Sequence, residues 1–171
     1  MMATNQSIAF RDMAVTDIAE VLELERAIYP QPWSEGVFRD ELGRSDRVYI
    51  VAAVDDDAIV GFAGLMLIDA DAHVTTLAVR PRDRLAGLGT QLMLALISSG
   101  LELGARNLTL EVRATNSGAQ RLYEKFGMAA VGVRKHYYRD DDAVIMWATE
   151  IDQADYGRRL ADIRTELEGR S

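Results

Sequence analysis

Three apolar segments separated by short acidic turns constrain the fold of this chain more than any other feature. Residues 48–54 and 58–68 are rich in Val, Ile and Ala and are joined by three aspartates; a third run, residues 73–79, ends just before Arg80-Pro81. Small and β-branched apolar residues favour strands, short polar segments favour turns, and proline cannot continue a strand ladder. The sequence therefore predicts an antiparallel meander of three strands.

Helices and further strands are predicted on both sides of this meander. A strand over residues 8–11 precedes a helix capped by Thr16-Asp17 and a second helix capped by Ser34, with Trp33 and Phe38 placed to form a hydrophobic staple. After the meander, the expected order is helix, strand, helix and two strands, over residues 90–103, 107–112, 117–126, 129–137 and 143–151. This order predicts one mixed α/β sheet of about seven strands with about four flanking helices, in which the fourth and fifth strands splay and admit a ligand.

Composition and charge narrow the classes of function. The chain has no cysteine, which excludes a disulfide framework, a thiolate metal site and a cysteine nucleophile, so group transfer must be direct or use oxygen. The formal charge of −8 disfavours nucleic acid and favours cationic partners such as amines or basic peptides, although the same charge also serves solubility. Histidines and carboxylates do not show metal-ligand spacing, so no metal is predicted.

The predicted organisation is one domain over residues 1–151, followed by a charged helix or tail over residues 152–171. The first ten residues lack the pattern of a secretory signal, and no apolar stretch approaches the ~20 residues needed to cross a bilayer. We therefore expect a cytoplasmic protein without a membrane partner. The sequence favours a monomer only weakly and leaves the oligomeric state open.

A glycine-containing segment before the central helix is the strongest local motif. Gly87 and Gly89 remove the Cβ atoms that would keep a ligand away from the backbone, and a helix N-terminus directs N–H groups at an anion. A pyrophosphate fits such a site, but two glycines also serve ordinary tight turns. The segment has neither the lysine of a Walker loop nor the third glycine of the dinucleotide fingerprint.

Taken with its neighbours, this segment resembles the acyl-CoA signature of the GNAT superfamily, Arg/Gln-x-x-Gly-x-Gly/Ala, matched here by Arg84, Gly87 and Gly89. The segments LEVRATN from Leu110, AQRLYEKFG from Ala119 and RKHYYR from Arg134 resemble the RimI group of that superfamily, whose members acetylate protein N-termini. The resemblance covers roughly three quarters of the chain. It implies the GNAT fold and acetyl-CoA as the cosubstrate.

The resemblance also implies roles for individual residues. In the RimI group the glutamate of the LEV strand is the general base and the tyrosine of the LYE helix is the general acid, which correspond to Glu111 and Tyr123. The residues implied to bind acetyl-CoA are Leu77, Ala78, Val79, Arg84, Leu85, Ala86, Gly87, Leu88, Gly89, Thr90 and Asn116. The residues implied to bind the peptide are Trp33, Tyr137 and Tyr138. Leu85 and Ala86 depart from the family, where a polar or basic residue is common.

The chemistry of these residue types agrees with the implied roles. A peptide α-amine has a pKa of about 7.7–8.0 and must lose a proton before it attacks a thioester. A strand carboxylate can serve as the base directly or through a water, and a tyrosine can protonate the departing thiolate. By position alone, Glu111 reads as an exposed strand carboxylate paired with Arg113 or another cation, Tyr123 could pack in the helix interface, and Asn116 reads as a helix N-cap.

Two histidines and two tyrosines are further candidates. His73 could act as a second base or hold a relay water, or it could be a surface histidine at a strand end. His136 stands where the family more often has asparagine or another polar residue, and we assign it no catalytic part. Packing is an alternative role for one of Tyr137 and Tyr138, because neighbouring strand residues face opposite ways.

The expected reaction is acetyl transfer from acetyl-CoA to a protein N-terminus, which the resemblance implies to be the N-terminal alanine of ribosomal protein S18. Two alternatives remain: transfer to a lysine, a small amine or an antibiotic, and a catalytically silent acyl-CoA-binding module. The Trp33 loop and the paired tyrosines favour a peptide, and the presence of both Glu111 and Tyr123 argues against the silent module. A toxin acting on charged tRNA would need a basic surface.

Overall fold

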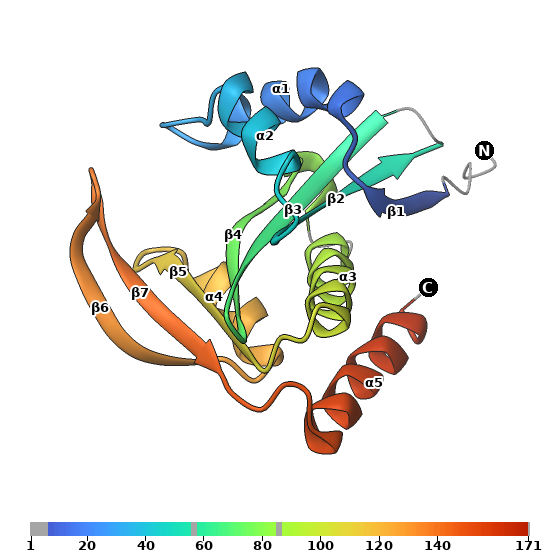
Figure 1. Cartoon of the computed structure of the whole chain (residues 1–171), viewed down its shortest axis with the longest axis vertical. Coiled ribbons are helices and arrows are strands. Elements are labelled where there is room, and N and C mark those ends of the chain that lie inside the picture. Colours follow the sequence, from blue (N-terminus) through green and yellow to red (C-terminus); the bar gives the residue numbers. More distant parts are fainter. Residues whose placement is uncertain (1–6, 56–57, 85–86, 171) are drawn as a thin grey trace. The chain divides into compact units, whose positions relative to one another are not determined.

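The computed structural model describes residues 7–55, 58–84 and 87–170 of the chain. Within these residues it contains seven β-strands and five α-helices (Figure 1). The strands are β1 (Ile8–Asp12), β2 (Arg47–Val54), β3 (Ala58–Ile68), β4 (Asp71–Val79), β5 (Asn107–Arg113), β6 (Ala129–Tyr138) and β7 (Asp141–Ala148). The helices are α1 (Ile18–Ile28), α2 (Glu35–Leu42), α3 (Leu88–Glu102), α4 (Ser117–Lys125) and α5 (Ala154–Glu168). The order of elements expected from the sequence is confirmed.

The strands form one mixed sheet in the order β1-β2-β3-β4-β5-β7-β6. The β4–β5 pair is parallel and runs from Asp71–Asn107 to His73–Thr109, whereas β5–β7 and β6–β7 are antiparallel. Among the described residues the β4–β5 register ends at His73, which agrees with the predicted splay of these strands. The chain divides into two compact units, residues 1–65 with 76–97, and residues 66–75 with 98–171.

The core of the first unit lies between its strands and helices α1 and α2. Helix α1 buries one apolar face, and Phe38 of α2 is fully buried beside Tyr49 and Phe62. Ser34 caps α2 by accepting a hydrogen bond from the N–H of Val37, and the rings of Trp33 and Phe38 lie 5.3 Å apart. The predicted cap and staple are both confirmed, so local sequence signals determine how the chain enters α2.

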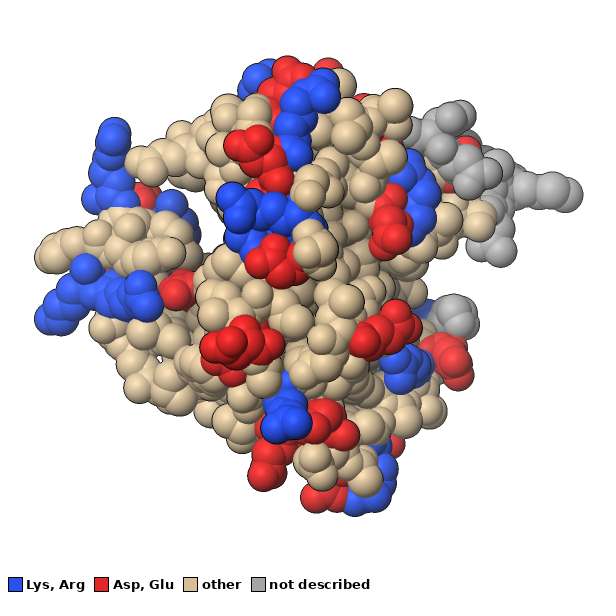
Figure 2. All heavy atoms as spheres, in the orientation of Figure 1, with Lys and Arg blue, Asp and Glu red and all other residues tan. Residues whose placement is uncertain are grey.

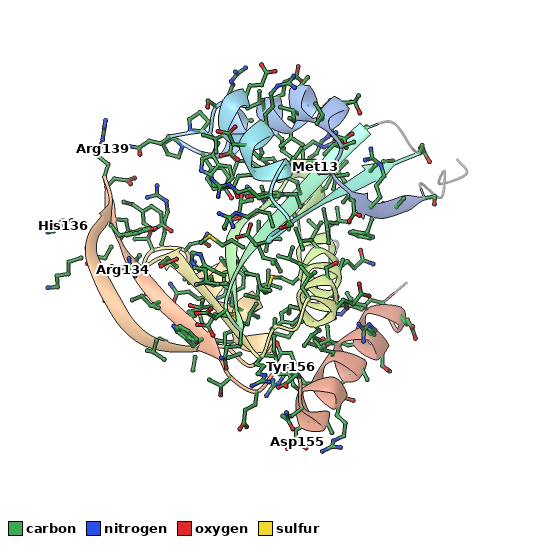
Figure 3. The ribbon with its side chains drawn as sticks, viewed as in Figure 1. Met13, Arg134, His136, Arg139, Asp155 and Tyr156 are labelled. Atoms are coloured by element: carbon green, nitrogen blue, oxygen red, sulfur yellow. The ribbon has the colours of Figure 1, made fainter. Side chains whose placement is uncertain are left out.

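The second unit contains the β5–β7–β6 strands with helices α4 and α5. Helix α5 buries three apolar side chains, Tyr156, Leu160 and Ile163. The hydroxyl of Tyr156, labelled in Figure 3, donates a 2.7 Å hydrogen bond to the carbonyl of Phe126, just after α4. Burial raises the pKa of Tyr156 to about 12, so this hydroxyl stays a donor at neutral pH. The charged segment after Ile151 is thus a packed helix, while the domain boundary at that residue stays a prediction.

The ends of several elements differ from those expected. Asp17 precedes α1 as predicted, but its carboxylate does not cap the helix; it accepts from the guanidinium of Arg11 and from the N–H of Ala14. Helix α3 begins two residues early, at Leu88, and β7 ends at Ala148 rather than Ile151. No helix within the described residues is long and apolar enough to span a membrane.

Candidate active site

A carboxylate–imidazole pair lies where β4 and β5 run side by side in the second unit. The Nε2 atom of His73 is 2.5 Å from Oε2 of Glu111, and the two side chains are only 21% and 13% exposed. The register explains the contact: His73 pairs with Thr109, and Glu111 is two residues further along β5, on the same face. His73 is therefore not simply a surface histidine at a strand end.

The second oxygen of Glu111 faces a cation from β6. The Nη2 atom of Arg134 is 3.8 Å from Oε1 of Glu111. Arg113 has other partners: it forms an ion pair with Asp140 and its guanidinium lies 4.3 Å from the ring centre of Tyr138. Glu111 is therefore neither exposed nor paired with Arg113; it is a half-enclosed carboxylate between an imidazole and another cation, the guanidinium of Arg134.

The two hairpin tyrosines lie together beside this carboxylate. The rings of Tyr137 and Tyr138 are 5.1 Å apart in a T-shaped arrangement, and the Tyr138 hydroxyl donates a 3.4 Å hydrogen bond to the carbonyl of Glu111. Tyr137 is 49% exposed, and Arg134 lies 5.7 Å from the centre of its ring. Figure 2 shows Lys and Arg side chains gathered over the β6–β7 hairpin. The hairpin thus presents an aromatic and positively charged surface.

Helix α4 carries the other predicted residues of this unit. The Asn116 side chain accepts a 3.1 Å hydrogen bond from the N–H of Ala119, so it is the N-cap of α4. Tyr123 lies two turns further along the helix and is 8% exposed. Gly127 ends the turn after α4 with a positive φ of 78°, a conformation that glycine adopts without strain. Tyr123 is thus packed in the helix interface, as one of the two interpretations expected. The general-acid role that the resemblance implies stays a prediction for the same side chain.

The glycine segment predicted to bind pyrophosphate belongs to the first unit. Gly87 has a φ of 80° and its carbonyl accepts the first helical hydrogen bond of α3, from the N–H of Gln91, at 3.0 Å. The Nε atom of Arg84 donates to the carbonyl of Val79 at 3.1 Å, which ties the segment to the end of β4. Leu88 and Thr90 are buried, whereas Leu85 and Ala86 lie outside the described residues. A glycine is therefore required at Gly87 by the backbone itself.

Sequence reasoning missed a second polar cluster, at the end of α1 in the first unit. The Tyr29 hydroxyl donates a 2.9 Å hydrogen bond to the carbonyl of Leu77 on β4, and burial raises its pKa. Glu25, 4% exposed, accepts a 3.1 Å hydrogen bond from the N–H of Trp33, while its Oε2 has no hydrogen-bond partner among the described residues. Acidic residues inside an amphipathic helix face are the sequence signal for such a cluster. These contacts hold the loop between α1 and α2, and they tie α1 to β4, the strand whose backbone is predicted to bind acetyl-CoA.

The buried Glu25 carboxylate should make stability fall with rising pH. Burial raises its pKa above the ordinary value of 4.5, and the Trp33 N–H opposes this only in part. A raised folded-state pKa means that the protonated group favours the folded state, and that this contribution is lost as pH rises past the folded-state pKa. The difference in Tm between Glu25→Gln and the wild type should therefore grow by several degrees, in favour of the variant, as the pH rises from 4 to 8. For a chain of this size, each kcal/mol of stability changes Tm by about 2–4 °C.

Thermal unfolding of both proteins across this pH range measures the effect, and the exposed Glu23→Gln change, on the same helix, serves as the control. A Tm difference between Glu25→Gln and the wild type that stays constant from pH 4 to pH 8 would contradict the prediction.

Comparison with known proteins identifies the family. The model of the acetyltransferase (GNAT) family matches residues 18–128. A putative [ribosomal protein bS18]-alanine N-acetyltransferase of Bacillus subtilis is 38% identical over 143 residues, covering 82% of this chain and 95% of the relative. An N-alpha-acetyltransferase of Sulfurisphaera tokodaii is 31% identical over 81% of this chain and 90% of its own length.

A solved structure agrees with these sequence relatives. The ribosomal-protein-S18-alanine N-acetyltransferase from Escherichia coli superposes with a TM-score of 0.76 and 28% identity, over 84% of this chain and 94% of that chain. The mixed sheet with its parallel β4–β5 pair and the glycine turn before α3 define a GNAT-type fold. The chain belongs to the GNAT acetyltransferase family. Within that family, the two relatives and the solved structure are named as N-terminal alanine or N-alpha-acetyltransferases.

Proposed function

We propose that this protein transfers the acetyl group of acetyl-CoA to the N-terminal α-amine of a protein, and that its substrate is the N-terminal alanine of ribosomal protein bS18. The paired Glu111 and His73 side chains, next to an exposed aromatic hairpin, are the observation that carries the proposal. The substrates named for the Bacillus subtilis and Escherichia coli relatives support it. A cytoplasmic location follows from that substrate.

The residues present fit acetyl-CoA as the cosubstrate. The left-handed Gly87 and the start of the fifteen-residue helix α3 form a turn at which backbone N–H groups receive an anion. Arg84, Gly87 and Gly89 would hold the pyrophosphate, the backbone of residues 77–79 the pantetheine arm, and Asn116 a further polar group. Acetyl-CoA supplies the activated acetyl thioester. Among the described residues there is no His, Asp and Glu group that could hold a metal.

The Glu111–His73 pair is the proposed proton acceptor. The 2.5 Å contact between Nε2 and Oε2 lets Glu111 orient the imidazole ring, so that the two groups can act together as the base. The substrate ammonium gives one proton to this pair, directly or through a water, and its nitrogen lone pair then attacks the thioester carbonyl carbon. Arg134 beside Glu111 adds a positive charge that disfavours the ammonium form of the bound amine. We therefore propose Glu111 as the base, acting together with His73.

Tyr123 is the proposed general acid. When the tetrahedral adduct collapses, the C–S bond breaks and the thiolate leaves with the proton of the Tyr123 hydroxyl, while the new amide keeps the acetyl group. The new amide nitrogen gives up its extra proton, which returns to the tyrosinate through solvent, and solvent removes the proton held by the base pair, so both groups are restored. The backbone N–H of Val79 is the proposed donor to the oxyanion. No cysteine is present to carry the acetyl group, and we propose that the transfer to the amine is direct.

The proposal is tested by incubating the protein with labelled acetyl-CoA and short peptides that begin with Ala-Arg or with Met. Each peptide is paired with a copy whose N-terminus is blocked but which contains a free lysine. We expect label only on the free α-amine, and faster transfer to the peptide that begins with alanine. Equal labelling of the blocked peptides would move the acceptor to lysine. No labelling despite tight binding of acetyl-CoA would favour a small-amine acceptor or a silent binding module.

A further inference from the structure

Strand β6 contains a left-handed residue in its middle. His136 has a φ of 56°, although a non-glycine residue pays a steric cost in this region. At the same place the register with β7 shifts. Arg134 pairs with Ala143 and Tyr138 pairs with Asp141, so an advance of four residues along β6 matches an advance of only two residues along β7. The N–H of His136 donates a 2.8 Å hydrogen bond to the side chain of Asp142, which holds the bulge.

The bulge changes which face of the hairpin the side chains occupy. In a regular strand, residues 134 and 137 would face opposite sides, as would residues 137 and 138. Here Arg134 reaches Glu111 at 3.8 Å and also lies 5.7 Å from the ring of Tyr137, and that ring contacts Tyr138. Tyr138 in turn reaches the carbonyl of Glu111 on β5. Arg134 therefore lies by the carboxylate of Glu111, Tyr138 reaches the backbone of the same residue, and Tyr137 contacts both Arg134 and Tyr138.

The imidazole of His136 is not part of this group. Figure 3 shows it extending from the outer side of the hairpin, whereas Arg134 lies on the inner side, toward β5. Among the described residues its ring has no hydrogen bond or ion pair, and the residue is exposed. His136 therefore contributes through its backbone conformation, because its exposed ring makes no polar contact with the described residues of the site.

We infer that the left-handed bulge at His136 is a positioning device that turns Tyr137, Tyr138 and Arg134 to one face and so builds the surface on which the first residues of the substrate peptide lie. The inference rests on the proposed function and names the part of the chain that selects a peptide over a small amine. Two aromatic rings offer a hydrogen-bonding and apolar surface for an extended backbone, and one of them is half exposed to receive it. His136 acts through the tyrosines and is a positioning residue.

Three substitutions of His136 separate conformation from ring chemistry. His136→Gly and His136→Asn remove the imidazole but tolerate a positive φ, whereas His136→Val removes it and disfavours that conformation strongly. Ala129→Val places the same β-branched side chain at an exposed position of the same strand with ordinary backbone angles, and serves as the control. Steady-state kinetics with the alanine peptide gives KM for the peptide, KM for acetyl-CoA and kcat for each variant.

We expect His136→Val to raise the peptide KM by about tenfold or more, while KM for acetyl-CoA stays constant and the Gly, Asn and control variants remain within about threefold of the wild type. In nuclear magnetic resonance spectra, the ring-to-ring contact of Tyr137 and Tyr138 should persist in His136→Gly and vanish in His136→Val. The ring contact reports the bulge without relying on activity.

Three results would overturn the inference. An unchanged peptide KM in His136→Val would show that the bulge does not position the surface. An equal loss in the Gly, Asn and Val variants would assign the role to the imidazole instead. A wild-type protein that acetylates no α-amine at all would refute the proposed function and the peptide surface with it, and is recognised before any variant is compared.

Discussion

Glu111→Gln is expected to lower kcat/KM for an N-terminal peptide by about 10²–10⁴-fold, the usual contribution of a positioned general base. Glutamine has nearly the same shape and can still accept the hydrogen bond from His73, but it has no carboxylate that can take up a proton from the substrate ammonium. The charge that faces Arg134 at 3.8 Å is lost as well. The fall should appear in kcat, because acetyl-CoA is predicted to bind mainly through the first unit.

Glu124→Gln is the matched control for this change. Glu124 is exposed on α4, immediately after Tyr123, so the substitution removes the same charge without touching the pair. It should leave kcat/KM within about twofold, since surface substitutions away from special features have small effects. Loss of activity in both variants would indicate that net charge rather than the base is responsible.

A double-mutant cycle with His73→Ala shows whether the two residues act as one unit. If they share one proton, each single change removes most of the base function, and the double variant should be hardly slower than either single variant. Fully additive losses would contradict the shared role. A Glu111→Gln protein with an unchanged pH–rate profile would refute the assignment of Glu111 as the base.

Much of the fold could be predicted from local patterns in the sequence. The apolar runs of β2 and β3, the Ser34 cap with its Trp33–Phe38 staple, and the Asn116 cap of α4 each depend on residues within five positions of one another. Such signals need no knowledge of the tertiary structure, and all of these were confirmed. Asp17 is the exception, because the guanidinium of Arg11 on β1 competes for its carboxylate.

The arrangement of the site was less accessible from sequence, because its contacts join distant positions. His73 and Glu111 are 38 residues apart and meet only through the parallel β4–β5 register, which periodicity cannot predict. The rule that neighbouring strand residues face opposite ways failed at Tyr137 and Tyr138 because it assumes a regular strand.

Gly61→Ala is expected to destabilise the protein by about 1–3 kcal/mol, the usual cost of overpacking a close-packed interior. A Cβ atom on Gly61 would lie 2.9 Å from the carbonyl oxygen of Ala78, 3.0 Å from a methyl group of Leu92 and 3.6 Å from the Cα atom of Val79. The first neighbour is backbone, which cannot move aside alone, so β4 must shift. Thermal unfolding should show a fall in Tm of about 2–4 °C per kcal/mol.

Gly157→Ala makes the same chemical change where the opposite result is expected. Gly157 lies in the exposed part of α5 with no atom within 4 Å of the added Cβ, so alanine should stabilise the helix by about 0.5–1 kcal/mol.

Gly61→Ala should also weaken acetyl-CoA binding, because the strand that must shift includes Ala78 and Val79, whose backbone is proposed to hold the pantetheine arm. A folded Gly61→Ala protein with an unchanged Kd for acetyl-CoA would separate this strand from the cosubstrate site, whereas a raised Kd alongside normal binding in Gly157→Ala would tie the two together.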